Sequence, residues 1–227
     1  MTLLQSQPRP LAHVRGRGGV MAAWTGSAGD SAAARWALDW AHRTGRPLTV
    51  LVSGAAASPG AAYRSDLADA LGIPVAMTEP PFLDVVVQPG DPASAVLAAV
   101  SDVDVLVLPV DGPAPVAGRS LGRTAETIVA RGTTTVVIVT ALHRRDPEGT
   151  VVVGEDVDPQ VLRGLAAHAP VVRTATVEAM IDASRAADLV VARCDGSRDS
   201  TTAHRPADCR ALQVAASAWS PVLAVHA

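Results

Sequence analysis

The sequence predicts an α/β fold of two related units, each a parallel sheet with helices on both faces. Short apolar stretches alternate with amphipathic stretches along the chain, which is the pattern of strand–helix–strand units joined by right-handed crossovers. One stretch, DVDVLVLPV at 102–110, is apolar almost throughout, as expected for a strand buried on both faces. The same order of elements begins again after residue 149 in a shorter form.

The composition allows a large core and excludes several classes of function. The chain has 227 residues, 48% of them hydrophobic and 3% aromatic, so we expect a core of small aliphatic side chains. All 19 basic residues are Arg, which excludes a P-loop, Schiff-base or kinase-type lysine. A net charge of −3 without a long block of one sign argues against a nucleic-acid partner.

Cysteine and histidine usage gives no sign of a metal or a disulfide scaffold. Cys194 and Cys209 are the two cysteines, and both are expected to be small core residues. The six histidines show no ligand spacing. No apolar run approaches transmembrane length, and the N-terminus lacks a signal-peptide core. We therefore expect a soluble cytoplasmic protein with no membrane partner.

The first unit is expected to contain five strands separated by helices. The first helix is the clearest, because Ala33, Trp36, Ala37, Trp40 and Ala41 recur at helical spacing and form one apolar face. Ser27, Asp30 or Ser31 could cap the start of this helix. Gly45 is expected to cap its end. The predicted strands are 18–24, 47–53, 82–88, 102–110 and 134–140, and the later helices are 65–71, 91–100 and 120–131.

The second unit repeats these parts. VDVLVLPVDG at 103–112 matches ADLVVARCDG at 187–196, so that Gly112 aligns with Gly196, and TTVVIVT at 134–140 matches SPVLAVH at 220–226. The second copy is shorter, and one strand–helix unit is predicted to be missing between His168 and Val171. Its predicted strands are 150–156, 170–175, 188–193 and 220–227, and its helices are 158–169, 177–186 and 208–218.

The domain organisation follows from this repeat. We predict an N-terminal extension at 1–17, a first domain at 18–142, a charged linker at 143–149 and a shortened second domain at 150–227. The missing unit is expected to leave a sheet face of the second domain exposed. Exposed apolar surface commonly marks an interaction site, so we expect a protein partner or a homo-oligomer there.

Three stretches of the first domain resemble the universal stress protein family: VMAAWTGSAGDSAAARWALDWA at 20–41, VVVQPGDPASAVLAAVSDVDVLVLP at 85–109, and the glycine loop that follows. The resemblance implies a five-stranded parallel sheet with helices on both faces. It also implies that the two units pack as an intramolecular pseudo-dimer, with 134–140 and 220–226 as neighbouring strands. It predicts a non-catalytic regulatory or stress-response protein.

Members of the family that bind ATP share two features. One is a glycine loop, in which G-x-x-G is followed after nine residues by G-[S/T], and the other is an acidic residue after the first strand. Here Gly112 and Gly122 keep the nine-residue spacing. Pro109 replaces the first glycine and lacks an N–H, Arg123 replaces the hydroxyl residue with Thr124 one position late, and Thr25 replaces the acidic residue. In the second copy, the position ten residues after Gly196 is Pro206.

The resemblance therefore gives candidate nucleotide contacts in a degenerate pocket: Thr25, Gly26, Ser27, Gly112, Gly122, Arg123 and Thr124. Thr25–Ser27 fit either ligand contacts or a turn and helix cap. Arg119 and Arg123 fit either a charge clamp on phosphate or solvated helix residues. We expect no tight ATP binding and no firm cofactor, with ATP or AMP held by the first domain as the alternative.

A rival interpretation is a serine hydrolase. Gly118-Arg119-Ser120-Leu121-Gly122 fits G-x-S-x-G, and Asp188 or Asp195 with His204 would follow in triad order. However, Ser120 lies far beyond the end of the preceding strand, and no oxyanion-loop motif is present. We therefore expect that the protein is not an enzyme.

Overall fold

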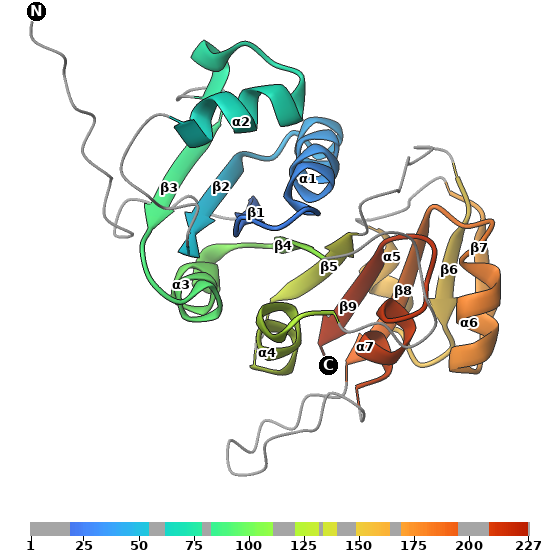
Figure 1. Ribbon diagram of the computed structural model, residues 1–227. Coiled ribbons are helices and arrows are strands. Elements are labelled where there is room, and N and C mark those ends of the chain that lie inside the picture. The colour runs from blue at the N-terminus through green and yellow to red at the C-terminus, as the bar shows by residue number, and fades with distance from the viewer. Residues whose placement is uncertain are drawn as a thin grey trace, which may run out of the picture.

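The strands form one continuous nine-stranded sheet (Figure 1). The computed structural model describes residues 19–54, 62–78, 83–110, 121–131, 134–139, 149–163, 169–194 and 209–226. Within these residues the strands are β1 Val20–Trp24, β2 Leu48–Ser53, β3 Asp84–Gln88, β4 Val105–Pro109, β5 Thr135–Val139, β6 Val151–Gly154, β7 Val171–Thr174, β8 Leu189–Cys194 and β9 Val222–His226. The predicted fold class, a mostly parallel α/β sheet, is confirmed.

The order of strands across the sheet is β3-β2-β1-β4-β5-β9-β8-β6-β7. Neighbouring strands are parallel except β5 and β9, which pair antiparallel through Val136–Ala224, Val137–Leu223 and Ile138–Val222. This confirms that the strands at 134–140 and 220–226 are neighbours. Outward from that junction, β9, β8, β6 and β7 take the places that β5, β4, β1 and β2 take in the first half.

The shortening of the second half falls at a different place from the one predicted. β7 lies beside β6 as β2 lies beside β1, so the strand without a counterpart is β3. Two residues, Ala175 and Thr176, separate β7 from the next helix, where the first half has a helix and β3. The prediction of a missing unit between His168 and Val171 was wrong, because apolar character alone does not say which place in the sheet a strand takes.

Helices cover both faces. Their bounds are α1 Asp30–Thr44, α2 Ala62–Leu71, η3 Val75–Thr78, α3 Pro92–Ala99, η4 Val100–Asp102, α4 Arg123–Arg131, α5 Pro159–Arg163, α6 Val177–Ala183 and α7 Arg210–Ala215. Helices α1, α2 and α5 pack on one face of the sheet. Helices α3, α4, α6 and α7 pack on the other face. The extension at 1–17 and most of the linker at 143–149 lie outside the described residues.

The apolar face and the C-terminal glycine predicted for the first helix are confirmed. Its five predicted apolar-face residues are all buried, and the rings of Trp36 and Trp40 stack with centroids 5.0 Å apart. Gly45 ends α1 with φ of 63°, a left-handed conformation that a residue with a side chain adopts at a cost. Every residue of β4 is buried, as expected of a strand covered on both faces.

Candidate functional site

The described candidate residues of the first half lie where the carboxyl ends of β1, β2 and β4 meet. Gly54, just after β2, packs against Pro92 at the start of α3. A Cβ on Gly54 would lie 2.9 Å from Pro92 Cγ and 3.7 Å from the carbonyl oxygen of Thr25. The loops that follow β1, β2 and β3 therefore touch one another at this edge, which is where ligands of parallel α/β sheets bind.

The loop after β1 is closed around a carboxylate of the protein itself. Asp30 Oδ2 accepts hydrogen bonds from the backbone N–H of Thr25 at 2.9 Å, Gly26 at 2.7 Å and Ser27 at 3.1 Å. Its Oδ1 accepts from the hydroxyls of Ser27 at 2.9 Å and Thr25 at 3.3 Å. Three successive N–H groups and two hydroxyls form an anion cradle of the kind that holds phosphate. Here Asp30 occupies it.

The electrostatics of Asp30 reflect its burial. The residue is 2% exposed, and this desolvation raises the pKa of its carboxyl. The hydrogen bonds from Ser27, Gly26 and Thr25 act in the opposite direction on the pKa, because they are donated to the charged form. A phosphate group brought to this loop would meet donors already in use and a buried carboxylate of the same charge.

The sequence analysis considered Asp30 only as a cap for α1. The predicted caps Ser27, Asp30 and Ser31 were wrong, because the N-cap position is taken by Gly29 and no side chain makes a capping bond there. Asp30 instead reaches back to the loop that precedes it. Gly29 itself must be a glycine, because a Cβ there would lie 2.6 Å from the carbonyl oxygen of Val110, at the end of β4. The loop after β1 is thus packed directly against the beginning of the glycine loop.

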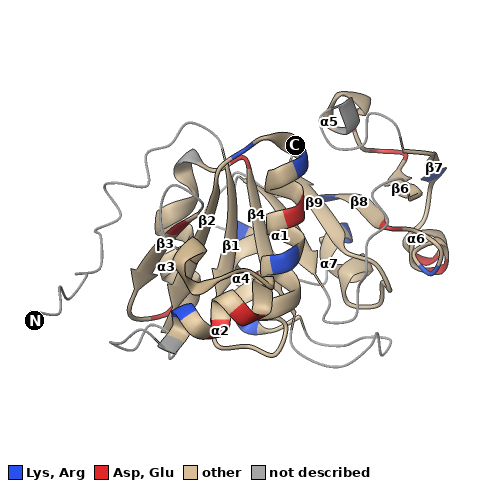
Figure 2. Cartoon of the chain, turned by 90° about the horizontal axis from the view of Figure 1, so that it is seen from above, with Lys and Arg blue, Asp and Glu red and all other residues tan. Residues whose placement is uncertain are grey.

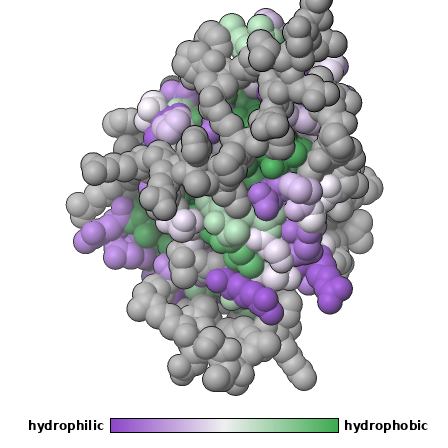
Figure 3. Space-filling view, turned by 90° about the vertical axis from the view of Figure 1, so that its left-hand side faces the viewer, coloured by the Kyte–Doolittle hydropathy of each residue, from purple (hydrophilic) through white to green (hydrophobic). Residues whose placement is uncertain are grey.

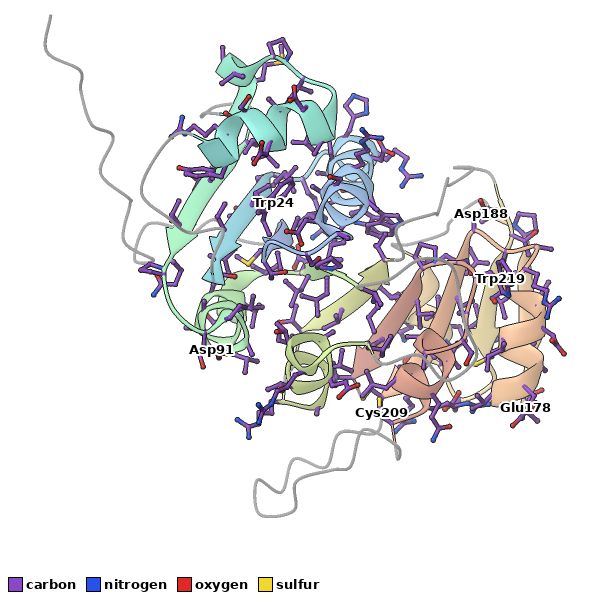
Figure 4. All side chains as sticks on the ribbon, in the orientation of Figure 1. Trp24, Asp91, Glu178, Asp188, Cys209 and Trp219 are labelled. Carbon is purple, nitrogen blue, oxygen red and sulfur yellow. The ribbon has the colours of Figure 1, made fainter. Side chains whose placement is uncertain are left out.

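The start of α4 carries the other described candidates. Gly122 has φ of 86°, in the left-handed region, and precedes Arg123 and Thr124 at the first turn of α4. Arg123 is exposed, and its charge helps to lower the pKa of Asp91. The larger causes of that lowering are the hydrogen bonds from the Ser94 hydroxyl and backbone N–H, at 2.7 and 2.8 Å, as Asp91 caps α3. Figure 4 labels Asp91 at the start of α3.

Helices α3 and α4 are neighbours, so Arg123 lies near a carboxylate. That placement is consistent with a solvated, charge-balanced residue. The remaining parts of the glycine loop, including Gly112, Arg119 and Ser120, lie outside the described residues, as does Gly196 in the second half. The described part of the edge therefore brings Thr25, Gly26 and Ser27 together around Asp30, and it places Gly122, Arg123 and Thr124 at the adjoining helix.

In the second half a different carboxylate lies at the equivalent edge. Asp156 follows β6, and its Oδ1 lies 3.2 Å from Arg210 Nη1. Arg210 begins α7, as Arg123 begins α4, and it also donates to the carbonyl oxygen of Ala175. An ion pair therefore spans this edge from the loop after the first strand to the last helix. The pair was not predicted from the sequence, although Asp156 two residues after β6 and Arg210 at the start of α7 were both visible.

Of the residues named for a hydrolase triad, Asp188 lies within the part of the chain that the structure describes. Asp188 precedes β8 at its amino end and lies against Gly149, where a Cβ would meet its carboxylate. Because β8 runs antiparallel to β4, this amino end of β8 lies at the same edge of the sheet as the carboxyl end of β4. Ser120, Asp195 and His204 lie outside the described residues. Both cysteines are buried, at 2% and 3% exposure, as predicted for core residues.

The described residues hold neither a cluster of metal-ligating side chains nor a membrane-spanning helix. They contain no group of three or more His, Cys, Asp or Glu side chains arranged to hold a metal ion. None of their helices is long and apolar enough to cross a membrane. In the cartoon of Figure 2, the positions of basic residues (blue) and acidic residues (red) are both spread over helices and the ends of strands.

Comparison with known proteins identifies the fold. A universal stress protein from Archaeoglobus fulgidus superposes with a TM-score of 0.61 at 12% identity, covering 91% of this chain and 98% of that chain. The chain has the universal stress protein fold. A proposed universal stress protein from Pseudomonas aeruginosa gives a TM-score of 0.60, also at 12% identity, covering 95% of each chain.

A functionally unknown protein from Pseudomonas aeruginosa has the same fold, with a TM-score of 0.61, 12% identity, and coverage of 96% of this chain and 95% of that chain. No protein-family model and no curated protein matches the sequence. At this level of identity the likeness establishes the universal stress protein fold and leaves ligand and function to be argued from the residues.

Proposed function

We propose that this protein is a non-catalytic, tandem regulatory or stress-response protein of the universal stress protein type, in which the adenine-nucleotide pocket of the first half is degenerate. The observation that carries the proposal is the Asp30 carboxylate in the cradle of Thr25, Gly26 and Ser27. Its five hydrogen bonds use the donors that the first loop would offer to a nucleotide. Displacing it would expose a carboxylate to a phosphate of like charge.

The end of β4 supports the same conclusion. Pro109, in place of the first glycine of the ATP-binding pattern, is the last residue of β4 and pairs with Val139 of β5. It has no N–H to donate to a phosphate. The next residue, Val110, is fully buried and donates its N–H to the Val139 carbonyl oxygen. The chain here extends the sheet ladder instead of turning its amides toward a ligand.

The tandem part of the proposal rests on the sheet order. β9, β8, β6 and β7 follow the order of β5, β4, β1 and β2, and the two halves meet in an antiparallel pair. A two-fold arrangement of two copies of one unit produces this pattern. In the second half, the pair Asp156–Arg210 crosses the edge at which a nucleotide would bind, which supports a second pocket without a nucleotide.

The test is isothermal titration of ATP, with and without Mg²⁺, into protein stripped of bound nucleotide by unfolding and refolding. We expect no binding heat at millimolar ATP. Micromolar binding that is lost in Arg123→Ala but retained in Arg131→Ala would refute the degenerate pocket and establish the alternative, a nucleotide-binding protein that uses its first half. Arg131 is the matched control because it is an exposed arginine at the other end of α4.

A further inference from the structure

Strand β7 ends the sheet with apolar side chains exposed on both of its faces. Val171 is 43% exposed and Val172 is 45% exposed. Because successive residues of a strand point to opposite faces, the two valines leave both faces of β7 uncovered. At the other end of the sheet, every residue of β3 is buried or half-buried. Figure 3 turns the β3 end of the molecule toward the viewer and shows apolar residues (green) among hydrophilic ones (purple).

The backbone of β7 also presents donors and acceptors to solvent. The carbonyl oxygens of Pro170 and Thr174 accept from the N–H groups of Val151 and Glu155, at 2.8 and 3.0 Å. Alternate residues of a parallel strand face the same neighbour. The N–H and C=O groups of Val171 and Arg173 therefore point away from β6, and no strand within the described residues lies beyond them. This is an edge that can accept another strand.

We propose that β7 pairs antiparallel with β7 of a second copy of this chain, forming a closed two-fold dimer. A strand that pairs with itself about a two-fold axis satisfies both edges and stops growth. Pairing of β7 with β3 of another copy would be head-to-tail and would build an open filament. Two-fold pairing centred on Val172 places the two Val172 side chains opposite each other and each Val171 opposite an Arg173.

The charges at the two ends of α6 favour this antiparallel direction. Glu178 and Arg185 are exposed, and they lie at the carboxyl and amino ends of the β6–β8 strands respectively. Figure 4 shows Glu178 and Trp219, the residue over which Arg185 stacks at 5.8 Å, at opposite ends of α6. Antiparallel pairing brings the Glu178 end of one copy toward the Arg185 end of the other, which is favourable at an interface.

Other charges near the edge limit the affinity. Asp182 is exposed midway along α6, so two-fold pairing brings it toward Asp182 of the second copy, and the two like charges repel. Asp188 lies at the Arg185 end but is half-buried, so Arg185 contributes more to the charge exposed there. A short strand pair is a small interface. We therefore expect a dimer that dissociates at micromolar concentration.

The experiment is sedimentation velocity on the full chain over a wide concentration range, comparing wild type with Arg173→Pro and Arg173→Ala. Proline at 173 removes an N–H that faces solvent and leaves the β6 ladder intact, since edge strands accept proline there. Wild type and Arg173→Ala are expected to dimerise, whereas Arg173→Pro weakens the dimer by at least about tenfold, or ~1.4 kcal/mol. Circular dichroism and thermal unfolding confirm that each variant folds.

A second variant keeps the proposal testable if Arg173→Pro does not fold. Val172→Lys places two like charges opposite each other at the two-fold axis and is expected to give a monomer. A wild type that remains monomeric at high concentration would overturn the proposal. A dimer that persists in both Val172→Lys and folded Arg173→Pro would also overturn it, because the interface would then lie elsewhere.

Discussion

Strands β2 and β7 occupy the same place in the two halves of the sheet, yet their environments differ. Both pair with the first strand of their half, and both are rich in valine. Five of the six residues of β2 are buried, whereas three of the four in β7 are exposed. The first half adds β3 and α2 after β2, and the second half proceeds directly to α6. Burial of a strand is thus decided by the segment that follows it.

The first loops of the two halves differ in the same way. In the first half, the Asp30 carboxylate is buried and accepts five hydrogen bonds within its own loop. In the second half, the side chain of Asp156 is 30% exposed and pairs with Arg210 across the edge. One carboxylate rigidifies a loop from within, and the other links two elements at the surface. The variants below test that contrast and the contrast between the strands.

The largest difference in the free energy of unfolding is expected between variants that remove one or the other of these two carboxylates. Asp30→Ala leaves three backbone N–H groups and two hydroxyls without their acceptor and is expected to lower the free energy of unfolding by ~2–4 kcal/mol. Asp156→Ala breaks a partly exposed ion pair and is expected to lower it by about 0–1 kcal/mol. Urea denaturation of both variants measures the difference. Equal losses would mean that the Asp30 cradle adds no stability beyond an ordinary surface pair.

The same valine-to-alanine substitution in the two strands is expected to give an intermediate difference in the free energy of unfolding. Val50 of β2 is fully buried, so Val50→Ala is expected to cost ~2 kcal/mol from lost burial and the cavity left behind. Val172→Ala in β7 removes the same atoms from an exposed position and is expected to cost roughly 0.5 kcal/mol or less. The measurement is chemical denaturation at a protein concentration where the chain is monomeric. A large loss in Val172→Ala under that condition would show that β7 is covered within the monomer.

The smallest effect concerns His226 at the end of β9. Burial lowers the pKa of His226 below 6.5, and its Nε2 has no hydrogen-bond partner among the described residues. As pH falls through 6.5 the unfolded chain takes up the proton first, so stability present at higher pH decreases toward the lower folded pKa. The variant His226→Gln should show a shallower decrease between neutral and mildly acidic pH. Denaturant midpoints at several pH values measure how steeply stability falls with pH. The same steepness in His226→Gln and wild type would contradict this assignment.

The sequence predicted the order and type of the elements because each depends on local signals. The face of α1 from Ala33 to Ala41, the left-handed Gly45 and the continuous apolar β4 were all visible as spacing or as single residues. The resemblance to universal stress proteins, applied to the internal repeat, also implied which strands are neighbours at the junction of the two halves. These predictions hold because periodicity, glycine conformation and repeat length are properties of short stretches.

The candidate site was less predictable because its chemistry depends on side chains meeting across loops. The sequence analysis named Thr25, Gly26 and Ser27, but it did not show that Asp30 turns back to accept their hydrogens. Nor did it show the influence of Arg123 on Asp91, which comes from packing of α3 against α4. The pair Asp156–Arg210 joins residues more than fifty positions apart, and no spacing rule connects them.

The sequence by itself determined an alternating α/β chain with a shortened repeat, because hydrophobic periodicity is encoded locally. Tertiary structure alone decided that the shortening falls after β7, that β7 becomes an edge, and that the anion cradle after β1 contains Asp30. Each of these depends on which segment covers or reaches another, and burial and hydrogen bonding between distant segments are settled only when the whole sheet assembles.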